Sequence, residues 1–296
     1  MLLKPATVHI LSAFVDDGVG GNPAGVVLDA EKYSKQERQT IAAKVGLSET
    51  AFVSSSTVAD YKLEFFTPTE QIPHCGHATI ATFSFLAQKG LLKKTKSSKE
   101  TVDGIRNIYL TDNLTFMEQT APRYTVVGPQ TPGVNTHLVM DSLFLNSANL
   151  PDNLFPIIAN TGNNFLLIPL RNEETLAKIR PEFGSVERIS KLLDLVGYYA
   201  FTTQGGGEHG DAVARMFGPA YGIPEESATG MAAGPLACYL HDVLGVKKQR
   251  YIIKQGQFMR PPSPSKIIVN LVVENEEITR LLVGGSATFL RAVTFG

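Results

Sequence analysis

The sequence predicts an α+β protein made of two related halves, each a mixed sheet around one central helix. The first observation is a repeated segment, FFTPTEQIP at residues 65–73 and MFGPAYGIP at residues 216–224. The second is that each copy leads into a stretch rich in small residues, CGHATIATFSFL at 75–86 and TGMAAGPLACYL at 229–240. Self-similarity along a chain is the signature of a repeated structural unit.

The patterns around these segments follow one order in both halves. Short apolar or alternating stretches predict strands. They include AGVVL (24–28), ETAFVSS (49–55) and YKLEFF (61–66) in the first half, and THLVMD (136–141), NFLLIPL (164–170) and YYAFTT (198–203) in the second. The central helices are expected from about residue 78 to 88 and from 231 to 244, because Gly90 and Gly245 suit the position just after a helix.

The boundary between the halves is predicted near residues 126–135, where VVGPQTPGVN is rich in proline and glycine. The first half then covers residues 1–125 and contains the first central helix. The second half covers residues 126–296 and contains the second central helix.

Composition excludes several classes of protein. The chain has 296 residues, 43% of them hydrophobic and 19% charged, with a net charge of −1. The sequence shows no basic run for nucleic acid and no apolar stretch long enough for a bilayer. Only Cys75 and Cys238 are cysteines, too few for a disulfide framework. A cytoplasmic protein is therefore expected, with neither a nucleic-acid partner nor a membrane partner.

Both central helices are expected to begin at proline-containing loops. A helix start offers unpaired N–H groups and the positive end of the helix dipole, which together favour an anion. If the halves face each other by pseudo-twofold symmetry, both starts open into the cleft between them. A small-molecule carboxylate is the ligand expected there.

Five ordered motifs then carry a resemblance to a known family. They are GGNPAGVV, LSETAFV, FFTP…IPHCGHAT, GIPEESATGMAAGPLA and QGQFMRPPS, and they span nearly the whole chain. In this order they resemble the PhzF-like family of phenazine biosynthesis. The resemblance implies the diaminopimelate-epimerase-like fold, with mostly antiparallel sheets in two pseudo-symmetric halves, and a homodimer. It also implies that the last strand, about residues 286–296, returns to the N-terminal half.

The same resemblance implies a cofactor-independent isomerase that moves a proton on a small carboxylate-bearing substrate. Matched motif by motif, it assigns catalysis to Glu49, His77 and Glu226. Glu49 would act as general base and then as acid, and partial burial is expected to raise its pKa toward neutrality. The substrate-binding residues implied by the motifs are Asn22, Gly76, Ala78, Thr229, Gly230 and Met231.

Two positions depart from the family pattern and keep an alternative open. Glu226 stands at the acidic position of the family's EDPATGS motif, and Met231 stands where that motif has serine. A glutamate is one methylene longer than an aspartate, and a methionine side chain donates no hydrogen bond. A small-molecule binding protein of the same fold, without turnover, is therefore the second hypothesis.

A cysteine-dependent racemase is the third hypothesis, and the sequence argues against it. Two-thiol racemases of this fold class use one cysteine from each half, but the position equivalent to Cys75 is Thr229, or Glu226 at the unshifted offset, and neither is a cysteine. Cys238 lies inside the predicted helix, more than about 10 Å along it from that loop. No metal is expected either, because His74, Cys75 and His77 share one tight loop and adjacent residues rarely point at one ion.

Overall fold

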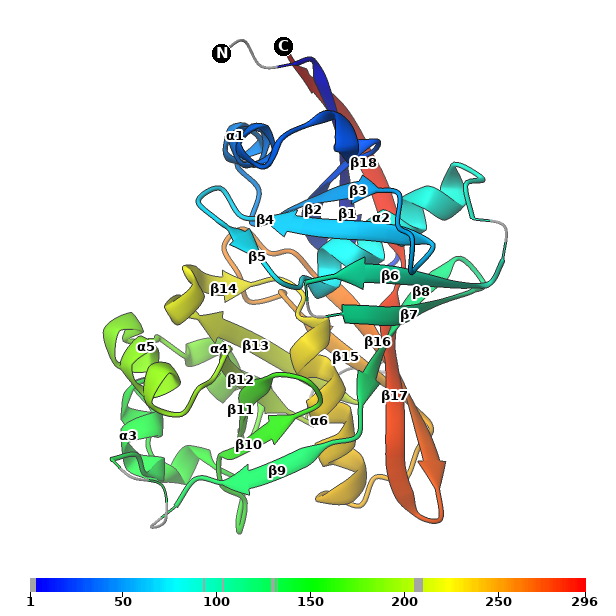
Figure 1. Ribbon diagram of the computed structural model, residues 1–296. Helices are drawn as coiled ribbons and strands as arrows, with labels where there is room; N and C mark the ends of the chain where they lie inside the picture. Colours follow the sequence, from blue (N-terminus) through cyan, green and yellow to red (C-terminus); the bar gives the residue numbers. More distant parts are fainter. Residues whose placement is uncertain (1–3, 93, 103, 129–130, 132, 205–209) are drawn as a thin grey trace. The chain divides into compact units, whose positions relative to one another are not determined.

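The computed structural model describes residues 4–92, 94–102, 104–128, 131, 133–204 and 210–296. The chain forms two compact units, the first running to Glu118 and including Gly284–Gly296, the second comprising Gln119–Val283 (Figure 1). Among the described helices, none combines the length and the apolar character that crossing a bilayer requires.

The first unit is a mixed sheet with one buried helix. Its elements are β1 (Ala6–Ala13), β2 (Asn22–Val27), η1 (Ala30–Lys32), α1 (Lys35–Val45), β3 (Thr50–Ser54), β4 (Tyr61–Phe66), β5 (Gln71–Ile72), α2 (Gly76–Gln88), β6 (Lys96–Thr101), β7 (Gly104–Thr111), most of β8 (Leu114–Thr120) and β18 (Ala287–Phe295). Hydrogen-bonded pairs give the strand order β18–β1–β2–β3–β4–β6–β7–β8, with β5 beside β4. The pairs β2–β3 and β4–β6 are parallel and the other pairs of this list are antiparallel.

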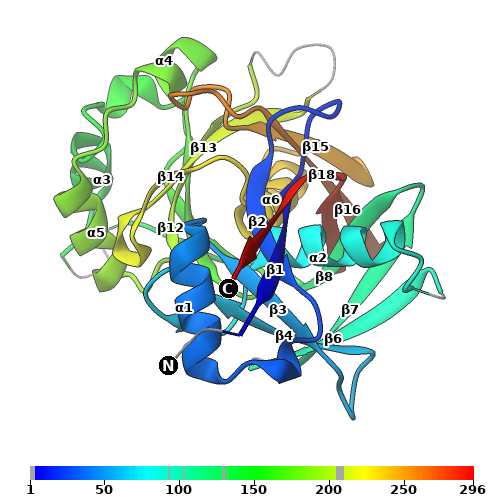
Figure 2. The same cartoon turned by 90° about the horizontal axis from the view of Figure 1, so that it is seen from above.

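Helix α2 forms the centre of this unit. Every residue from Gly76 to Leu86 is buried, as expected for a helix that is apolar on all sides. It packs against β1, β2, β3 and β18, which Figures 1 and 2 show beside it. Strand β18 pairs antiparallel with β1, Ala6 opposite Phe295, so the last strand of the chain belongs to the first unit.

The second unit repeats this arrangement. Its elements are β9 (Arg123–Val126), α3 (Thr136–Asp141), η2 (Ser147–Asn149), β10 (Ile157–Asn160), β11 (Asn164–Pro169), α4 (Glu173–Lys178), α5 (Phe183–Leu192), β12 (Gly197–Thr202), β13 (Ala212–Gly218), η4 (Pro219–Tyr221), β14 (Ile223–Glu226), α6 (Gly230–Asp242), β15 (Arg250–Gln255), β16 (Ser265–Glu274) and most of β17 (Glu277–Gly285). The pairs give the order β9–β10–β11–β12–β13–β15–β16, with β14 beside β13.

The two strand orders match element by element. The series antiparallel, parallel, antiparallel, parallel and antiparallel runs through β1–β2–β3–β4–β6–β7 and again through β10–β11–β12–β13–β15–β16. Helix α6 is buried from Ala232 to His241 and packs against β10, β11, β15 and β16. At Gly234 a Cβ would come too close to the ends of the Gln119 and Leu281 side chains, so a larger residue would force both side chains to shift. The fold class predicted from the duplication is confirmed.

Two features differ from the sequence-based expectations. The chain passes from the first unit to the second at Glu118–Gln119, ahead of residue 126, because β9 already pairs with β10. Within the expected linker, residues 129, 130 and 132 lie outside the described residues. The predicted strand at 136–141 is wrong: the segment is helix α3, because the Asn135 side chain accepts from Leu138 N and caps a helical turn.

Candidate active site

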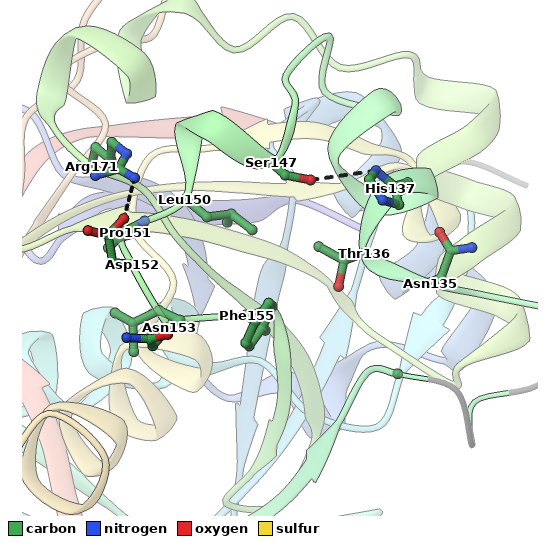
Figure 3. Close-up of a pocket in the computed structure, with 12 residues that line it drawn as sticks. Asn135, Thr136, His137, Ser147, Leu150, Pro151, Asp152, Asn153, Phe155 and Arg171 are labelled. Carbon is green, nitrogen blue, oxygen red and sulfur yellow. Dashed lines mark hydrogen bonds and ion pairs between the residues drawn. The ribbon is translucent and has the colours of Figure 1, made fainter.

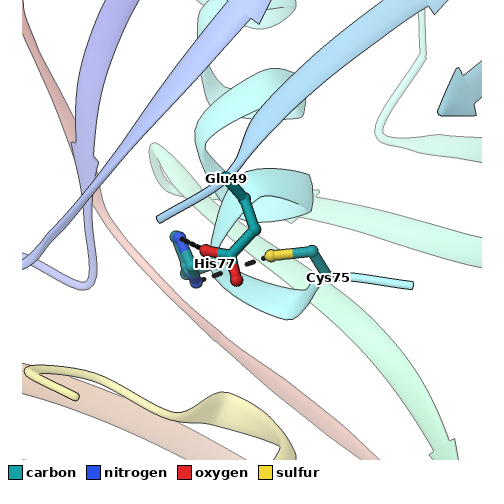
Figure 4. A group of neighbouring side chains, drawn as sticks. All are labelled: Glu49, Cys75 and His77. Carbon is teal, nitrogen blue, oxygen red and sulfur yellow. Dashed lines mark hydrogen bonds and ion pairs between the residues drawn. The ribbon is translucent and has the colours of Figure 1, made fainter. Parts of the chain in front are cut away.

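A buried acid–base pair lies at the start of α2. Glu49 directly precedes β3, and its carbonyl oxygen accepts from Gly25 N at 3.1 Å, which fixes the backbone there. His77 is in the first turn of α2. The Glu49 Oε2 and His77 Nε2 atoms are 3.1 Å apart, and the two side chains are only 7% and 4% exposed (Figure 4). The fold thus brings together two of the three predicted catalytic residues.

Cys75 extends this pair on the other side of the imidazole ring. It is the N-cap residue of α2, and its Sγ lies 3.5 Å from His77 Nδ1. The ring therefore bridges a carboxylate at Nε2 and a thiol at Nδ1, as Figure 4 shows. Such a chain of three groups is suited to relaying a proton.

The charge state of Glu49 differs from the expectation. Burial opposes its ionisation, but the charge of His77 and hydrogen bonds from His77 and Ser48 outweigh burial, so the pKa of the Glu49 carboxyl lies below its ordinary value. The predicted rise toward neutrality is wrong, because it considered burial without the partner. Burial raises the pKa of the Cys75 thiol, so this group stays protonated at neutral pH.

The same three side chains offer atoms of types that bind metal ions, within 4.8 Å of one another. As arranged, however, His77 uses opposite ring nitrogens toward Glu49 and Cys75. An ion at Nδ1 would take the place of the thiol contact, because one imidazole nitrogen serves one partner. The geometry is that of an imidazole ring placed between a carboxylate and a thiol, and a reaction without metal or cofactor stays a prediction.

The start of α2 differs from the start of α1 in how the helix is capped. Helix α1 begins with a capping box in which Ser34 and Glu37 satisfy each other's backbone N–H groups. Within the described residues, neither Cys75 at α2 nor Thr229 at α6 makes a capping hydrogen bond with its side chain. First-turn N–H groups without a side-chain cap suit an anionic ligand.

The second unit gathers another group of predicted site residues around Gln255. Thr229, the N-cap residue of α6, donates its hydroxyl to the Glu226 carboxylate. Gln255 is fully buried on β15; its Oε1 accepts from Thr229 N at 3.1 Å and from the Tyr199 hydroxyl at 2.9 Å. Its Nε2 donates to the Glu226 carbonyl at 2.7 Å and to Thr229 Oγ1 at 3.1 Å. The amide therefore holds the loop between β14 and α6.

Met231 and Gly230 share one partner. Gln119 Nε2 donates to the Gly230 carbonyl at 3.1 Å and lies 3.5 Å from the Met231 sulfur. Gln119 Oε1 in turn accepts from the Thr161 hydroxyl at 2.7 Å. Met231 thus takes part in a polar network, through a sulfur that accepts a hydrogen bond where a serine could also donate one.

The remaining predicted residues belong to the first unit. Gly76 and Ala78 are buried in the first turn of α2, on either side of His77. Asn22 is 5% exposed at the start of β2, opposite Ala13. The expectation that residues of both halves contact one substrate in a cleft between them stays a prediction.

Sequence reasoning missed Lys99, which is fully buried on β6 and contacts the residue before Cys75. The local pattern KSSKET is polar and typical of an exposed strand, so it carries no signal for a buried cation. Gln119 was missed for the same reason, since a glutamine in a strand is ordinarily solvated.

A separate cavity of about 660 Å³ lies in the second unit (Figure 3). Its lining residues are Gly128, Asn135, Thr136, His137, Ser147, Leu150, Pro151, Asp152, Asn153, Leu154, Phe155 and Arg171. The Arg171 guanidinium is paired with the exposed Asp152 carboxylate at 2.6 Å, and His137 Nδ1 lies 3.5 Å from the Ser147 hydroxyl. These pairs are exposed to solvent, so the described residues of this cavity do not form a buried acid–base arrangement like that at Glu49.

Comparison with known proteins agrees with this fold. Residues 11–292 match the model of the PhzC-PhzF family, described as phenazine biosynthesis-like protein. The uncharacterized isomerase YddE of Escherichia coli K12 is 29% identical, with 97% of each chain covered. The trans-2,3-dihydro-3-hydroxyanthranilate isomerase of Pseudomonas chlororaphis is 28% identical, with 97% of this chain and 96% of that protein covered.

Solved structures lead to the same family. The crystal structure of the Bacillus anthracis phenazine biosynthesis protein of the PhzF family has a TM-score of 0.88 and 28% identity, with 99% of each chain covered. A hydroxyproline epimerase from Agrobacterium vitis has a TM-score of 0.59 at 11% identity, with 99% of this chain and 93% of that chain covered, and shares the fold alone. This chain belongs to the phenazine biosynthesis-like PhzC-PhzF family.

Proposed function

We propose that this protein is an isomerase of the PhzF type that moves a proton on a small carboxylate-bearing substrate without a cofactor. The observation that carries the proposal is the buried Glu49–His77 pair, 3.1 Å apart at the start of α2. Two named relatives over nearly the full length are isomerases, which supports the same reaction class.

Glu49 is the group assigned to remove the proton. Its pKa lies below the ordinary value, so it is a carboxylate at neutral pH and can accept a proton from an acidic carbon. The electron pair left on carbon shifts into the neighbouring unsaturated system. The proton then returns from Glu49 to a different carbon of that system, and His77 balances the charge of the carboxylate in between.

The substrate carboxylate is assigned to the start of α2, where Gly76 and Ala78 form the first turn. A helix start supplies N–H donors and the positive end of the dipole. We assign the second acid–base role to Glu226, and further substrate contacts to Thr229, Gly230, Met231 and Asn22. The hydroxyl of Thr229 restrains the Glu226 carboxylate, which supports a positioned rather than a solvated acid.

The substrate class follows from this chemistry. The substrate should have a carboxylate group and a carbon acid whose anion is delocalised, as in an unsaturated or cyclic acid. The relative from Pseudomonas chlororaphis is named for trans-2,3-dihydro-3-hydroxyanthranilate, which has these features. That compound is therefore the first probe. A homodimer is the proposed assembly, which sedimentation velocity would test.

Deuterium exchange tests the proposal directly. Wild-type protein is incubated in D₂O with trans-2,3-dihydro-3-hydroxyanthranilate and with a panel of unsaturated and amino acids, and incorporation is followed by mass spectrometry. We expect wash-in and isomerisation of at least one acid, and a loss of about 10²–10⁴-fold in Glu49→Gln. A sample treated with EDTA should keep its full rate.

Glu64→Gln is the matched control, because Glu64 is also a partly buried glutamate paired with a cation, Arg38. It should keep the wild-type exchange rate. Equal rates in wild type and Glu49→Gln would contradict the assignment of Glu49. Calorimetric binding of the same acids with no exchange of any proton would support the binding-protein alternative instead.

A further inference from the structure

Lys99 is a buried cation that the proposed reaction does not use. It lies on β6 with 0% of its surface exposed. Its Nζ donates to the Thr79 hydroxyl at 2.6 Å, lies 3.2 Å from His74 Nδ1 and sits 5.2 Å from the centre of the Phe65 ring. Burying an ammonium group is unfavourable unless it has specific partners, so these contacts define its place.

The contacts of Lys99 with His74 and Thr79 lead to the start of α2. His74 is the residue before Cys75. Thr79 donates its hydroxyl to the Cys75 carbonyl at 2.6 Å, so it links the ammonium to the N-cap residue. Lys99 therefore holds this loop at two points. It contacts the His74 side chain directly, and it is linked to the Cys75 carbonyl through the Thr79 hydroxyl.

The contact between Lys99 and His74 also gives His74 a different role from His77. Burial, Lys99 and Arg106 hold the pKa of His74 well below its ordinary value, so its ring is neutral and Nδ1 accepts from the ammonium. His77, three residues on, turns toward Glu49. One imidazole thus anchors the loop while the other forms the acid–base pair.

We propose that Lys99 is a positioning residue, which holds His74 and, through Thr79, the Cys75 carbonyl, and so sets His77 against Glu49. This inference rests on the proposed function for its catalytic consequence, but its geometric content does not depend on turnover. The three partners described above lie on β4, in the loop before α2 and on α2, all within the first unit.

The test compares Lys99→Met, which keeps the length and removes the charge, with wild type. The readout is the titration of the Glu49 carboxyl by ¹³C NMR, assigned by its absence in Glu49→Gln. When His77 is no longer held, burial of Glu49 prevails, and we expect the carboxyl pKa to rise by about one unit. Deuterium wash-in should slow by about tenfold or more, because misplacement of a reacting group costs rate.

Thr79→Val, which removes the linking hydroxyl, should raise the pKa of the Glu49 carboxyl in the same direction, and Thr79→Ser should restore the wild-type titration. Thr82→Val is the matched control. Thr82 is also fully buried in α2 and donates to the carbonyl four residues before it, Ala78, at 2.7 Å. It should lower the melting temperature as Thr79→Val does, without moving the titration.

The outcomes separate the two proposals. If no acid exchanges with wild type but the Glu49 titration moves in Lys99→Met, the proposed function fails and the positioning role stands. If Lys99→Met does not fold, the Thr79 pair decides. A Glu49 titration that is the same in Thr79→Val, Thr79→Ser and wild type would overturn the positioning role and leave Lys99 with a purely structural one.

Discussion

The loops that start α2 and α6 occupy the same place in two copies of one framework, yet they carry different chemistry. At α2 the side chains are titratable: Glu49, His77 and Cys75 form one chain, with the Lys99 ammonium behind the loop. At α6 the loop is held by a neutral amide, Gln255, which binds Thr229 and the Glu226 backbone. Among the described residues, the two repeats thus have similar loops, and only the loop at α2 contains a buried acid–base pair.

The difference extends to the strands that precede the two loops. Glu64 on β4 and Arg215 on β13 occupy equivalent positions of the repeat, and each forms a partly buried ion pair of the opposite sense. Glu64 pairs with Arg38, whereas Arg215 pairs with Glu225. Equivalent positions of the repeat therefore carry opposite charges and pair with different elements, Glu64 with α1 and Arg215 with β14.

The largest expected effect is a difference in activity between a variant of the first loop and a variant of the second. His77→Asn removes the partner of Glu49 and should slow deuterium wash-in about 10²–10³-fold. Glu226→Gln should slow it about tenfold, because a glutamine can still accept from Thr229. Wash-in by both variants is measured by mass spectrometry on the same acid. A greater loss in Glu226→Gln than in His77→Asn would contradict the assignment of the main acid–base chemistry to the first loop.

The next effect concerns stability at the second loop. Arg215 donates to both Glu225 oxygens, at 2.7 and 2.8 Å, and to the carbonyls of Leu176 and Ile179, each at 3.1 Å. Arg215→Met should lower the free energy of unfolding by about 3–5 kcal/mol, because it leaves a partly buried carboxylate without its charge partner. Urea denaturation measures this change.

The control for that experiment is an exposed ion pair of the same unit, Lys191 with Glu187 at 2.5 Å. Lys191→Met should change the free energy of unfolding by less than about 1 kcal/mol. Similar losses in both variants would mean that Arg215 contributes no more than a surface charge.

A smaller loss is expected when the amide behind α6 is removed. Gln255→Leu leaves Thr229 N and the Tyr199 hydroxyl without their buried acceptor and should destabilise the protein by about 1–3 kcal/mol. Gln255→Glu keeps that acceptor but turns a buried carboxylate toward the Glu226 carbonyl, so it should also destabilise the protein. Thermal melts of Gln255→Leu and wild type at pH 7 measure the loss, and an unchanged melting temperature would show that the acceptor is unimportant.

The smallest effect is a pH dependence located at the first loop. His74 is neutral when folded, with its pKa well below 6.5, but protonates in the unfolded chain near that value. Below about pH 6.5 the unfolded state binds one more proton than the folded state. The free energy of unfolding should therefore decrease as the pH is lowered, by at most about 1.4 kcal/mol per pH unit. His74→Gln should flatten this slope in urea denaturation between pH 6.5 and 5.

Glu49 contributes in a different pH window and with its own sign. Its folded-state pKa is lowered from 4.5, so its contribution is present above that value and is lost as the pH falls through the lowered pKa. A slope between pH 6.5 and 5 that persists in His74→Gln would therefore have to come from another group, and would contradict this assignment.

Many of the helices and strands could be predicted from the sequence, because local residue patterns determine them. The repeat located both central helices, which begin at Gly76 and Gly230, and the glycines that follow them, Gly90 and Gly245, have φ of 68° in both cases. Apolar alternation identified most of the strands. It failed at residues 136–141, where the capping side chain of Asn135 favours a short helix over an apolar strand.

The sequence by itself determined the duplicated fold, the family motifs and the identity of Glu49 and His77 as candidates. Only the tertiary structure decided that these two side chains meet, that Glu49 is more acidic than usual, and that Lys99 is buried behind the loop. The physical reason is that a pKa or a buried charge depends on groups from distant segments. Their distances arise when the strands pair, and no local pattern of residues encodes them.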